Sequence, residues 1–284
     1  MSEVRKVKRV ITGQRTSDGA GVKLTRMFGQ DETTMMDPFL MLDHFGSDRP
    51  EDYMAGFPMH PHRGIETVTY MMEGRVDHRD SMGNEGTIGP GDLQWMTAGS
   101  GILHEEMPYD TGGPMKGFQL WVNLPKASKM TAPKYRGIVK DDIPVVDLGA
   151  GSSVKVIAGD FDGTKGAVSE LAVDVGYYDV GLMPRTVIEY EVPRSKNAFA
   201  VVYDGEIMVG EERKKVRSEE LAVLGAGDRA VAEVGSRPAK FLFVSGTPLR
   251  EPIAWGGPIV MNTDEELRLA SDELRKGTFI KDAR

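Results

Sequence analysis

The sequence predicts an all-β protein built from two tandem β-barrels, with one short helix near the C-terminal end. Short segments rich in Val, Tyr, Phe and Thr alternate with turn residues along most of the chain, as short strands do. The clearest are residues 66–72, 117–124, 198–205 and 240–246. A chain of 284 residues is too long for one small barrel and long enough for two.

A weak internal repeat supports two copies of one barrel. Residues 70–74 read YMMEG and residues 201–205 read VVYDG, so each is expected to be a strand that ends in an acidic-Gly turn. At a similar offset, residues 89–92 read GPGD and residues 225–228 read GAGD. Coincidence is the alternative, because acidic-Gly turns are common in β proteins.

The domains are expected to follow this repeat. We expect an N-terminal barrel over residues 1–135 and a C-terminal barrel over residues 136–284. The stretch at 126–144 is polar, contains prolines and lacks a clear period, as linkers do.

One helix is expected at residues 263–276, within the second domain. Thr263 can cap its first turn with Glu266 three residues later, which is the pattern of a capping box. Gly277 can end the helix, because glycine readily adopts the left-handed conformation that follows a last turn. We expect this helix to cover a barrel and to carry no chemistry.

The composition limits the classes of function. The net charge of −8 makes direct nucleic-acid binding and attachment to an anionic membrane unexpected. The absence of cysteine excludes disulfides, zinc ribbons, cysteine-ligated iron–sulfur clusters and thiol nucleophiles. Residues 1–11 lack the continuous apolar segment of a secretory signal. The expected location is therefore the cytoplasm, and also the nucleus if the source is a eukaryote.

The histidines carry the clearest chemical signal. All five lie within the first 104 residues, so a histidine site belongs to the first barrel. His60 and His62 are two residues apart, as are His104 and Glu106. Side chains two apart on a strand share a face, and neighbouring strands lie about 4.8 Å apart, so both pairs can reach one ion. Three imidazoles and a carboxylate suit Fe(II), Mn(II), Ni(II) or Cu(II) and leave room for substrate or dioxygen.

The same alternation separates two neighbouring glutamates. Glu106 is expected to point with His104, and Glu105 to the opposite face, so Glu106 is the expected ligand. For His44 and His78 we expect a hydrogen-bonded core position or simple exposure. Four donors in two matched pairs are harder to explain as packing.

Two segments, GFPMHPHRGIETVTYMMEG at 56–74 and GPGDLQWMTAGSGILHEEMP at 89–108, resemble the pirin family of the cupin superfamily. The first looks like the cupin box that runs from a His-x-His pair to Glu66 and then Gly74. The family pattern also recurs at residues 37–45, 119–125, 248–253 and 256–267. The resemblance therefore covers nearly the whole chain.

The resemblance implies two tandem cupin (jelly-roll) barrels, of which only the first holds a metal. The residues that match the family's iron ligands are His60, His62, His104 and Glu106. Fe(II) is the expected metal, with Mn, Ni, Cu and Zn as alternatives. The general cupin pattern would instead use Glu66, which shares the parity of the first histidine pair and stays open as the alternative carboxylate. The second barrel, without histidine, is expected to give support and partner contacts.

The resemblance also implies a quercetin 2,3-dioxygenase activity, in which O2 opens a flavonol ring and carbon monoxide leaves. Glu106 would be the catalytic base that accepts the proton of the 3-hydroxyl, and the metal would act as a Lewis acid. The residues implied to contact a flat aromatic substrate are Asp43, Phe57, Met59 and Gln119. Core packing is the alternative for Phe57 and Met59. An extra stretch at 51–55 is expected to reshape the mouth of the pocket.

Two other functions stay open. One is a non-enzymatic, redox-sensing regulator that binds a protein partner, either a transcription coregulator or a metabolic enzyme. The other is a structural cupin whose metal only stabilises the barrel. A monomer is expected in each case.

Overall fold

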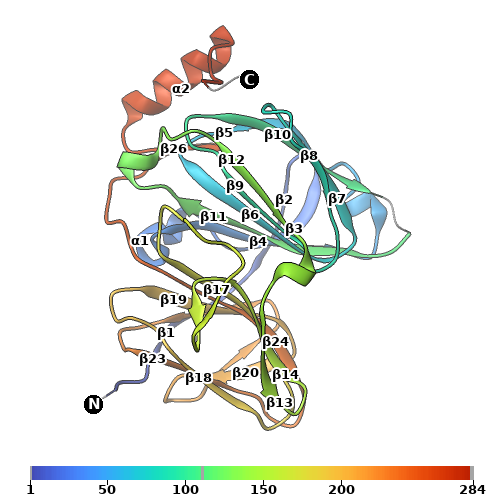
Figure 1. Ribbon diagram of the computed structural model, residues 1–284, viewed down its shortest axis with the longest axis vertical. Coiled ribbons are helices and arrows are strands. Elements are labelled where there is room, and N and C mark those ends of the chain that lie inside the picture. The colour runs from blue at the N-terminus through green and yellow to red at the C-terminus, as the bar shows by residue number, and fades with distance from the viewer. Residues whose placement is uncertain (1, 110–111, 282–284) are drawn as a thin grey trace. The chain divides into compact units, whose positions relative to one another are not determined.

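The computed structural model describes residues 2–109 and 112–281 (Figure 1). Most of the regular structure in these residues is β-strand, which confirms the all-β prediction. The α-helices are α1 (Thr33–Met36), a single turn, and α2 (Asp264–Lys276). Neither is long and apolar enough to cross a membrane. Short 3-10 turns are η1 (Gln30–Glu32), η2 (Pro50–Asp52), η3 (Lys126–Ser128) and η4 (Lys140–Asp142).

Helix α2 begins and ends where the sequence predicts. The Thr263 hydroxyl accepts a hydrogen bond from the backbone N–H of Glu266 at 3.2 Å, and the Glu266 carboxylate accepts one from the backbone N–H of Thr263 at 2.9 Å. This is the predicted capping box. Gly277 follows the last turn with φ at 68°, in the left-handed region.

The chain forms two compact units. The first, called here the histidine unit, consists of Arg15–Gln30, Phe39–Lys140 and Leu249–Arg284. The second, called the apolar unit, consists of Met1–Gln14, Asp31–Pro38 and Asp141–Pro248. The expected halves, 1–135 and 136–284, do not coincide with these units. The physical reason is strand pairing, since the strand Val7–Thr12 pairs with Glu220–Leu224 and Ile259 forms a parallel bridge with Arg63.

The histidine unit has a seven-stranded sheet in the order β12-β9-β6-β11-β4-β3-β2 and a four-stranded sheet in the order β5-β10-β7-β8. The bounds of these strands are β2 (Gln14–Asp18), β3 (Val22–Phe28), β4 (Phe39–Ser47), β5 (Phe57–His62), β6 (Ile65–Glu73), β7 (Arg75–Asp80), β8 (Glu85–Ile88), β9 (Leu93–Thr97), β10 (Ile102–Tyr109), β11 (Met115–Asn123) and β12 (Lys134–Ile138). A separate hairpin is formed by β25 (Ala254–Gly256) and β26 (Ile259–Met261). Hydrogen bonds from Thr69 and Gln94 to Glu106 cross between the two main sheets, which therefore face each other.

The apolar unit repeats this plan, with a seven-stranded sheet in the order β1-β22-β19-β24-β17-β14-β13 and a four-stranded sheet in the order β18-β23-β20-β21. The bounds are β1 (Val7–Thr12), β13 (Val145–Gly149), β14 (Ser152–Ala158), β15 (Asp160–Phe161), β16 (Thr164–Lys165), β17 (Val175–Leu182), β18 (Val187–Glu191), β19 (Asn197–Asp204), β20 (Glu206–Val209), β21 (Lys214–Arg217), β22 (Glu220–Leu224), β23 (Arg229–Glu233) and β24 (Ala239–Gly246). Apolar side chains from both sheets form its core. At the place that β10 takes in the histidine unit, β23 buries Ala230 and Ala232.

One pair of sequence repeats is equivalent in the fold and the other is not. Gly74 joins β6 to β7 with φ at 81°, and Gly205 joins β19 to β20 with φ at 77°, at the same step of each barrel. The GPGD of residues 89–92, however, joins β8 to β9, whereas the GAGD of residues 225–228 joins β22 to β23. The second pair is therefore a coincidence of turn composition, as the alternative reading allowed.

Candidate metal centre

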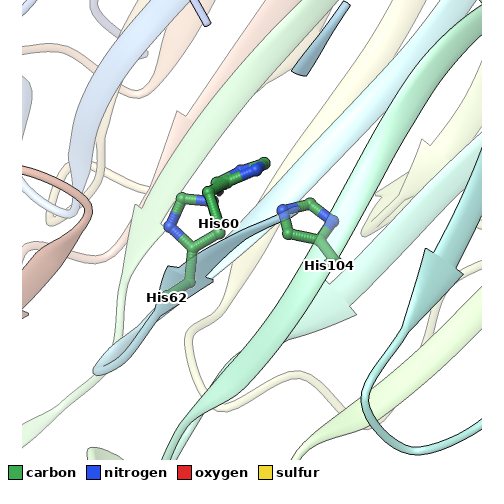
Figure 2. Close-up of side chains that lie close together, drawn as sticks. All are labelled: His60, His62 and His104. Atoms are coloured by element: carbon green, nitrogen blue, oxygen red, sulfur yellow. Dashed lines mark hydrogen bonds between the residues drawn. The ribbon is translucent and has the colours of Figure 1, made fainter. Parts of the chain in front are cut away.

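Three histidines meet where β5 pairs with β10. In this antiparallel pair, His104 lies directly opposite His60, and Ile102 lies opposite His62. Because alternate residues share a face, all three imidazoles project to the same side (Figure 2). One ring nitrogen from each lies within 4.8 Å of the others, which is the geometry of a group that holds one metal ion.

Two backbone carbonyls fix the orientation of the first two rings. The Nδ1 of His60 lies 2.9 Å from the carbonyl oxygen of Pro58, and the Nδ1 of His62 lies 3.0 Å from that of Pro258. A carbonyl can only accept, so both Nδ1 atoms carry a proton, and in a neutral ring the Nε2 atom then keeps a bare lone pair. These two Nε2 atoms lie 3.1 Å apart. Two lone pairs at that distance repel each other unless a cation lies between them.

His104 supplies the strongest test of whether a metal fits. Its side chain is buried, and neither ring nitrogen has a hydrogen-bond partner among the described residues. Burial lowers the pKa of His104 well below its ordinary value and lowers the pKa of His62 to about 3, with smaller contributions from neighbouring imidazoles. Both rings are therefore neutral at pH 7, the form that binds metals. Buried polar atoms normally have partners, and a cation would satisfy these.

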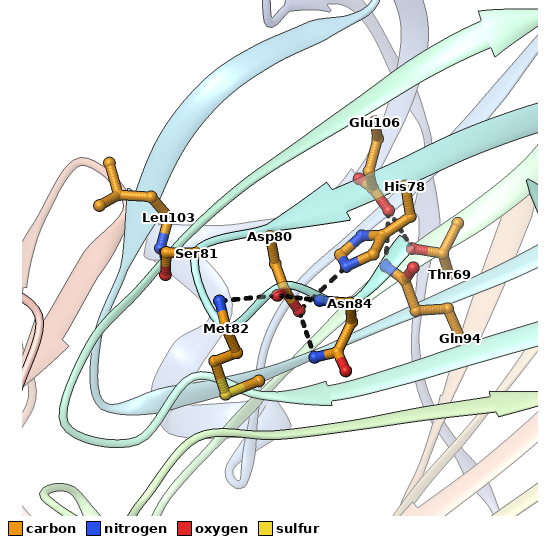
Figure 3. Close-up of polar contacts among 9 residues, drawn as sticks. All are labelled: Thr69, His78, Asp80, Ser81, Met82, Asn84, Gln94, Leu103 and Glu106. Atoms are coloured by element: carbon orange, nitrogen blue, oxygen red, sulfur yellow. Dashed lines mark hydrogen bonds and ion pairs between the residues drawn. The ribbon is translucent and has the colours of Figure 1, made fainter. Parts of the chain in front are cut away.

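Glu106 is not part of the three-histidine group, but it lies two residues after His104 on β10 and is held in place through its Oε1 atom. The Thr69 hydroxyl lies 2.8 Å from Oε1, and Gln94 Nε2 donates to the same oxygen at 2.9 Å (Figure 3). Among the described residues, none donates to Oε2, which leaves that oxygen for a ligand. Glu106 is buried, whereas Glu105 lies on the other side of β10 and forms an ion pair with Arg79. The two glutamates are thus oriented as the alternation predicted, and the metal-binding role of Glu106 stays a prediction.

Glu66 lies on the opposite face of its sheet from the barrel interior. Its carboxylate accepts hydrogen bonds from Trp95 Nε1 at 3.0 Å and Thr97 Oγ1 at 2.6 Å. Thr69 points inward, and residues three apart on a strand point to opposite faces. The parity that Glu66 shares with His62 is lost at Gly64, where φ is 78° and the chain turns. The structure therefore does not bring Glu66 to the histidines.

The histidine pair and Glu106 line a cavity of about 650 Å³. Three of the four expected substrate contacts, Asp43, Phe57 and Gln119, also line it. Met59 does not, which corrects the expectation for that residue. It neighbours His60 on β5, so it points to the opposite face, and 48% of its surface is exposed.

The extra stretch at 51–55 was expected to shape the mouth of this cavity. None of these residues is among the described residues that line it. Tyr53 is instead buried in a core cluster, and its hydroxyl donates to the carbonyl of Gly113 at 2.9 Å. The stretch therefore supports the barrel wall from outside the cavity, which corrects the expectation.

A row of polar side chains crosses one wall of the cavity. The strand registers place them side by side in the order Arg26, Asp43, Gln119, Thr69 and Gln94. Arg26 donates two hydrogen bonds to the Asp43 carboxylate, at 2.9 and 2.8 Å. Gln119 Oε1 lies 2.6 Å from the Thr69 hydroxyl, so the row reaches Glu106 through Thr69.

The aromatic walls of the cavity were largely missed by the sequence analysis. Trp121 lies edge-on to His62 at 5.0 Å between ring centroids, and it stacks with Trp255 at 5.9 Å. Trp121 shares the parity of Gln119 on β11, so alternation alone points to it. Trp255 and Pro258 come from the distant β25–β26 hairpin, and no local pattern marks them.

The two remaining histidines lie outside the three-histidine group. His44 stacks on Phe118 with ring centroids 4.6 Å apart, on the face of β4 opposite Asp43. His78 is buried on β7, where its Nε2 lies 3.3 Å from Asp80 Oδ2 (Figure 3). His44 is thus held by packing, whereas His78 keeps one hydrogen-bond partner and its buried Nδ1 has none among the described residues.

Comparison with known proteins decides the family. Residues 21–122 match the pirin family, and residues 177–280 match the pirin C-terminal cupin domain. A pirin-like protein of Caulobacter vibrioides is 50% identical over 277 residues, which cover 97% of this chain and 99% of that protein. The chain belongs to the pirin family. It is thus made of two cupin barrels, as the resemblance implied.

Solved structures agree with this assignment. A crystal structure of quercetin 2,3-dioxygenase from Acinetobacter baumannii superposes with a TM-score of 0.91 at 36% identity, over 97% of this pirin-family chain and 98% of that one. A more distant bacterial pirin from Escherichia coli, solved in complex with nickel(II), has a TM-score of 0.67 at 18% identity over 84% of this chain and 99% of that one. The second comparison supports the fold alone.

Proposed function

We propose that this chain is a mononuclear iron dioxygenase of the quercetin 2,3-dioxygenase type, which opens a flavonol ring with O2 and releases carbon monoxide. One observation carries the proposal. His60, His62 and Glu106 line a single cavity with flat aromatic walls. The similarity to the Acinetobacter baumannii quercetin 2,3-dioxygenase supports the same reaction class.

The proposed ligands are His60, His62, His104 and Glu106, and the proposed metal is Fe(II). Three neutral imidazoles with one carboxylate leave positions for substrate and dioxygen in a six-coordinate ion. When bound, the metal would supply Lewis-acid polarisation of the substrate oxygen. The nitrogen ligands are oriented in advance by the Pro58 and Pro258 carbonyls, which reduces the reorganisation needed for binding.

Glu106 is the proposed catalytic base. Its Oε1 is already hydrogen-bonded by Gln94 and lies beside Thr69, so Oε2 would take both roles. One lone pair of Oε2 would bind the metal, and the other would accept the proton of a flavonol hydroxyl. The contacts at Oε1 fix the orientation of the carboxylate. The carboxylate is thus held ready to take up a proton.

The cavity supports a planar, hydroxylated aromatic substrate. Phe57, Trp121 and Trp255 provide apolar faces, and a pocket for such a ligand is mostly apolar with few polar anchors. Asp43 and Gln119 lie in the polar row and are the proposed anchors for hydroxyl groups remote from the metal. A ligand that lies along this row would present one polar edge to it.

The test is anaerobic loading with Fe(II), addition of quercetin and then admission of air. Loss of the flavonol absorbance with release of carbon monoxide is the expected result. Glu106→Gln is expected to abolish turnover and to lower bound iron, whereas the matched control Glu105→Gln keeps both. Loss of iron only in Glu105→Gln would overturn the ligand assignment. No turnover in the wild-type protein, together with oxidation-dependent partner binding, would favour the regulator instead.

A further inference from the structure

The carbonyl that orients His62 belongs to the C-terminal part of the histidine unit. Pro258 lies between β25 and β26, and its carbonyl oxygen faces His62 Nδ1 at 3.0 Å. The register of this contact is fixed by the backbone next to it. The N–H of Val260 donates to the carbonyl of Arg63 at 3.1 Å, and Arg63 bridges Ile259 in parallel.

Arg63, directly after His62, is locked to the same segment. Its guanidinium is buried and donates to the carbonyl oxygens of Ser100 at 2.6 Å and Phe279 at 2.9 Å. Its Nη1 forms an ion pair with Glu273 of α2 at 2.7 Å, and its Cζ lies 4.2 Å from the centre of the Phe279 ring. A buried guanidinium without partners is strongly unfavourable, so Arg63 can hold this position only while α2 and Phe279 are docked.

Gly64, the next residue, is linked to the C-terminal segment by hydrogen bonds through a lysine. The buried Lys129 Nζ donates to the carbonyl oxygens of Gly64 and Val260, each at 2.9 Å, and to Asn123 Oδ1 at 2.7 Å. His62 and Arg63 are thus bound directly to residues 258–279, and Gly64 is linked to Val260 through Lys129. If α2 only covered the barrel, its contacts would not need to gather on the residues next to His62.

We propose that residues 249–281 are needed for metal binding. Glu273, in this segment, and Arg63, next to His62, would together position His62 for the metal. The docked segment supplies the carbonyl that sets the tautomer of His62, and the Arg63–Glu273 pair holds that carbonyl and the imidazole in register. This inference depends on the proposed metal site at His60, His62 and His104, but not on the proposed dioxygenase reaction. Arg63 and Glu273 act through His62 and are positioning residues.

The experiment compares Glu273→Gln with Asp272→Asn. Asp272 neighbours Glu273 on α2 and pairs with Arg275 at the surface, so the control removes the same charge from the same helix. Co(II) serves as the probe, because its affinity can be measured by chelator competition and its visible absorption reports ligand geometry. Both are measured on protein that circular dichroism shows to be folded.

Glu273→Gln is expected to weaken Co(II) binding by about 10-fold or more, within the range that outer partners of ligating histidines contribute, and to change the absorption spectrum. Asp272→Asn is expected to leave both unchanged. If Glu273→Gln does not fold, Phe279→Leu, which removes the ring beneath the guanidinium, provides the same comparison. A folded variant that binds Co(II) with wild-type affinity and spectrum, even at a lower melting temperature, would show that the segment only stabilises the barrel.

Discussion

The hydroxyl of Thr69, on the seven-stranded sheet of the histidine unit, lies 2.8 Å from Glu106 Oε1 on the four-stranded sheet. This contact joins the two walls of the cavity at the proposed catalytic carboxylate. Thr67, two residues earlier on the same face of β6, is also buried, but its hydroxyl has no hydrogen-bond partner among the described residues. The two threonines therefore form a matched pair.

We expect Thr69→Val to lower metal affinity by about 10-fold, because a hydrogen bond to a charged group contributes roughly 1.5–3 kcal/mol. Thr67→Val should leave the affinity unchanged and the protein at least as stable, since it removes an unpaired hydroxyl. Calorimetric titration of both variants with Co(II) measures the difference. Equal effects of the two substitutions would contradict a role for Thr69 in holding Glu106.

Replacing His104 should separate stability from metal binding. The ring nitrogens of His104 have no partner among the described residues, which destabilises the metal-free protein, so His104→Leu is expected to match or exceed the wild-type melting temperature in EDTA. Addition of Ni(II) should raise the melting temperature of the wild type, because a ligand that binds only the folded state stabilises it. The variant should show no such rise. A large fall in the melting temperature of the variant in EDTA would mean that His104 is part of the packed core rather than a site left open for a cation.

Lys129 is expected to be a strong determinant of stability. Lys129→Met removes the donor shared by the oxygens of Gly64, Asn123 and Val260. The Gly64 carbonyl keeps the Leu124 N–H at 3.3 Å, and each group left unsatisfied costs about 1–3 kcal/mol. We expect the free energy of unfolding to fall by about 2–4 kcal/mol in urea titrations. The control Lys126→Met changes an exposed side chain on the adjacent η3 turn. If the free energy of unfolding falls no more in Lys129→Met than in this control, the hydrogen bonds of Lys129 do not stabilise the protein as proposed.

His44 should contribute to acid sensitivity. Burial lowers its pKa from 6.5 to about 4 in the folded protein. The unfolded chain therefore binds one more proton between pH 6.5 and 4, and stability falls as the pH is lowered through that window. In His44→Phe, which keeps a ring beside Phe118, the free energy of unfolding should fall less steeply, by up to about 1.4 kcal/mol per pH unit. Parallel curves for variant and wild type would refute this contribution.

Local rules predicted the parts of this molecule that depend on neighbouring residues. Strand alternation correctly placed Glu105 and Glu106 on opposite faces, and cap chemistry placed both ends of α2. Alternation failed at Glu66, because the turn at Gly64 breaks the parity carried from His62. Alternation along β5 would have put Met59 on the face opposite His60. The family resemblance instead put it among the substrate contacts, which was wrong.

The contacts that cross long sequence distances were not predictable from the chain alone. The register between β3, β4 and β11 sets Arg26 beside Asp43 and Gln119, yet nothing near Arg26 marks it as a cavity residue. The same holds for Trp255 and Pro258, which reach the cavity from the C-terminal hairpin. Such contacts depend on loop closure and sheet pairing over the whole unit, and no short pattern records them.

The N-terminal strand belongs to the unit made mostly of later residues, and the C-terminal segment belongs to the unit made mostly of earlier ones. This arrangement has a consequence for biosynthesis. Strand β1 completes the sheet of the apolar unit by pairing with β22, and residues 249–281 complete the histidine unit. A ribosome releases the N-terminal strand first, and that strand has to wait unpaired until most of the chain has been translated. Domains usually fold one after another as they emerge, but here the large sheet of the apolar unit is complete only after both β1 and β22 have been made. The two main sheets of the histidine unit are made of residues 14–138 and receive the β25–β26 hairpin only later. The Pro258 carbonyl can reach His62 only after residue 258 has been translated, so the candidate metal centre is not complete before that point.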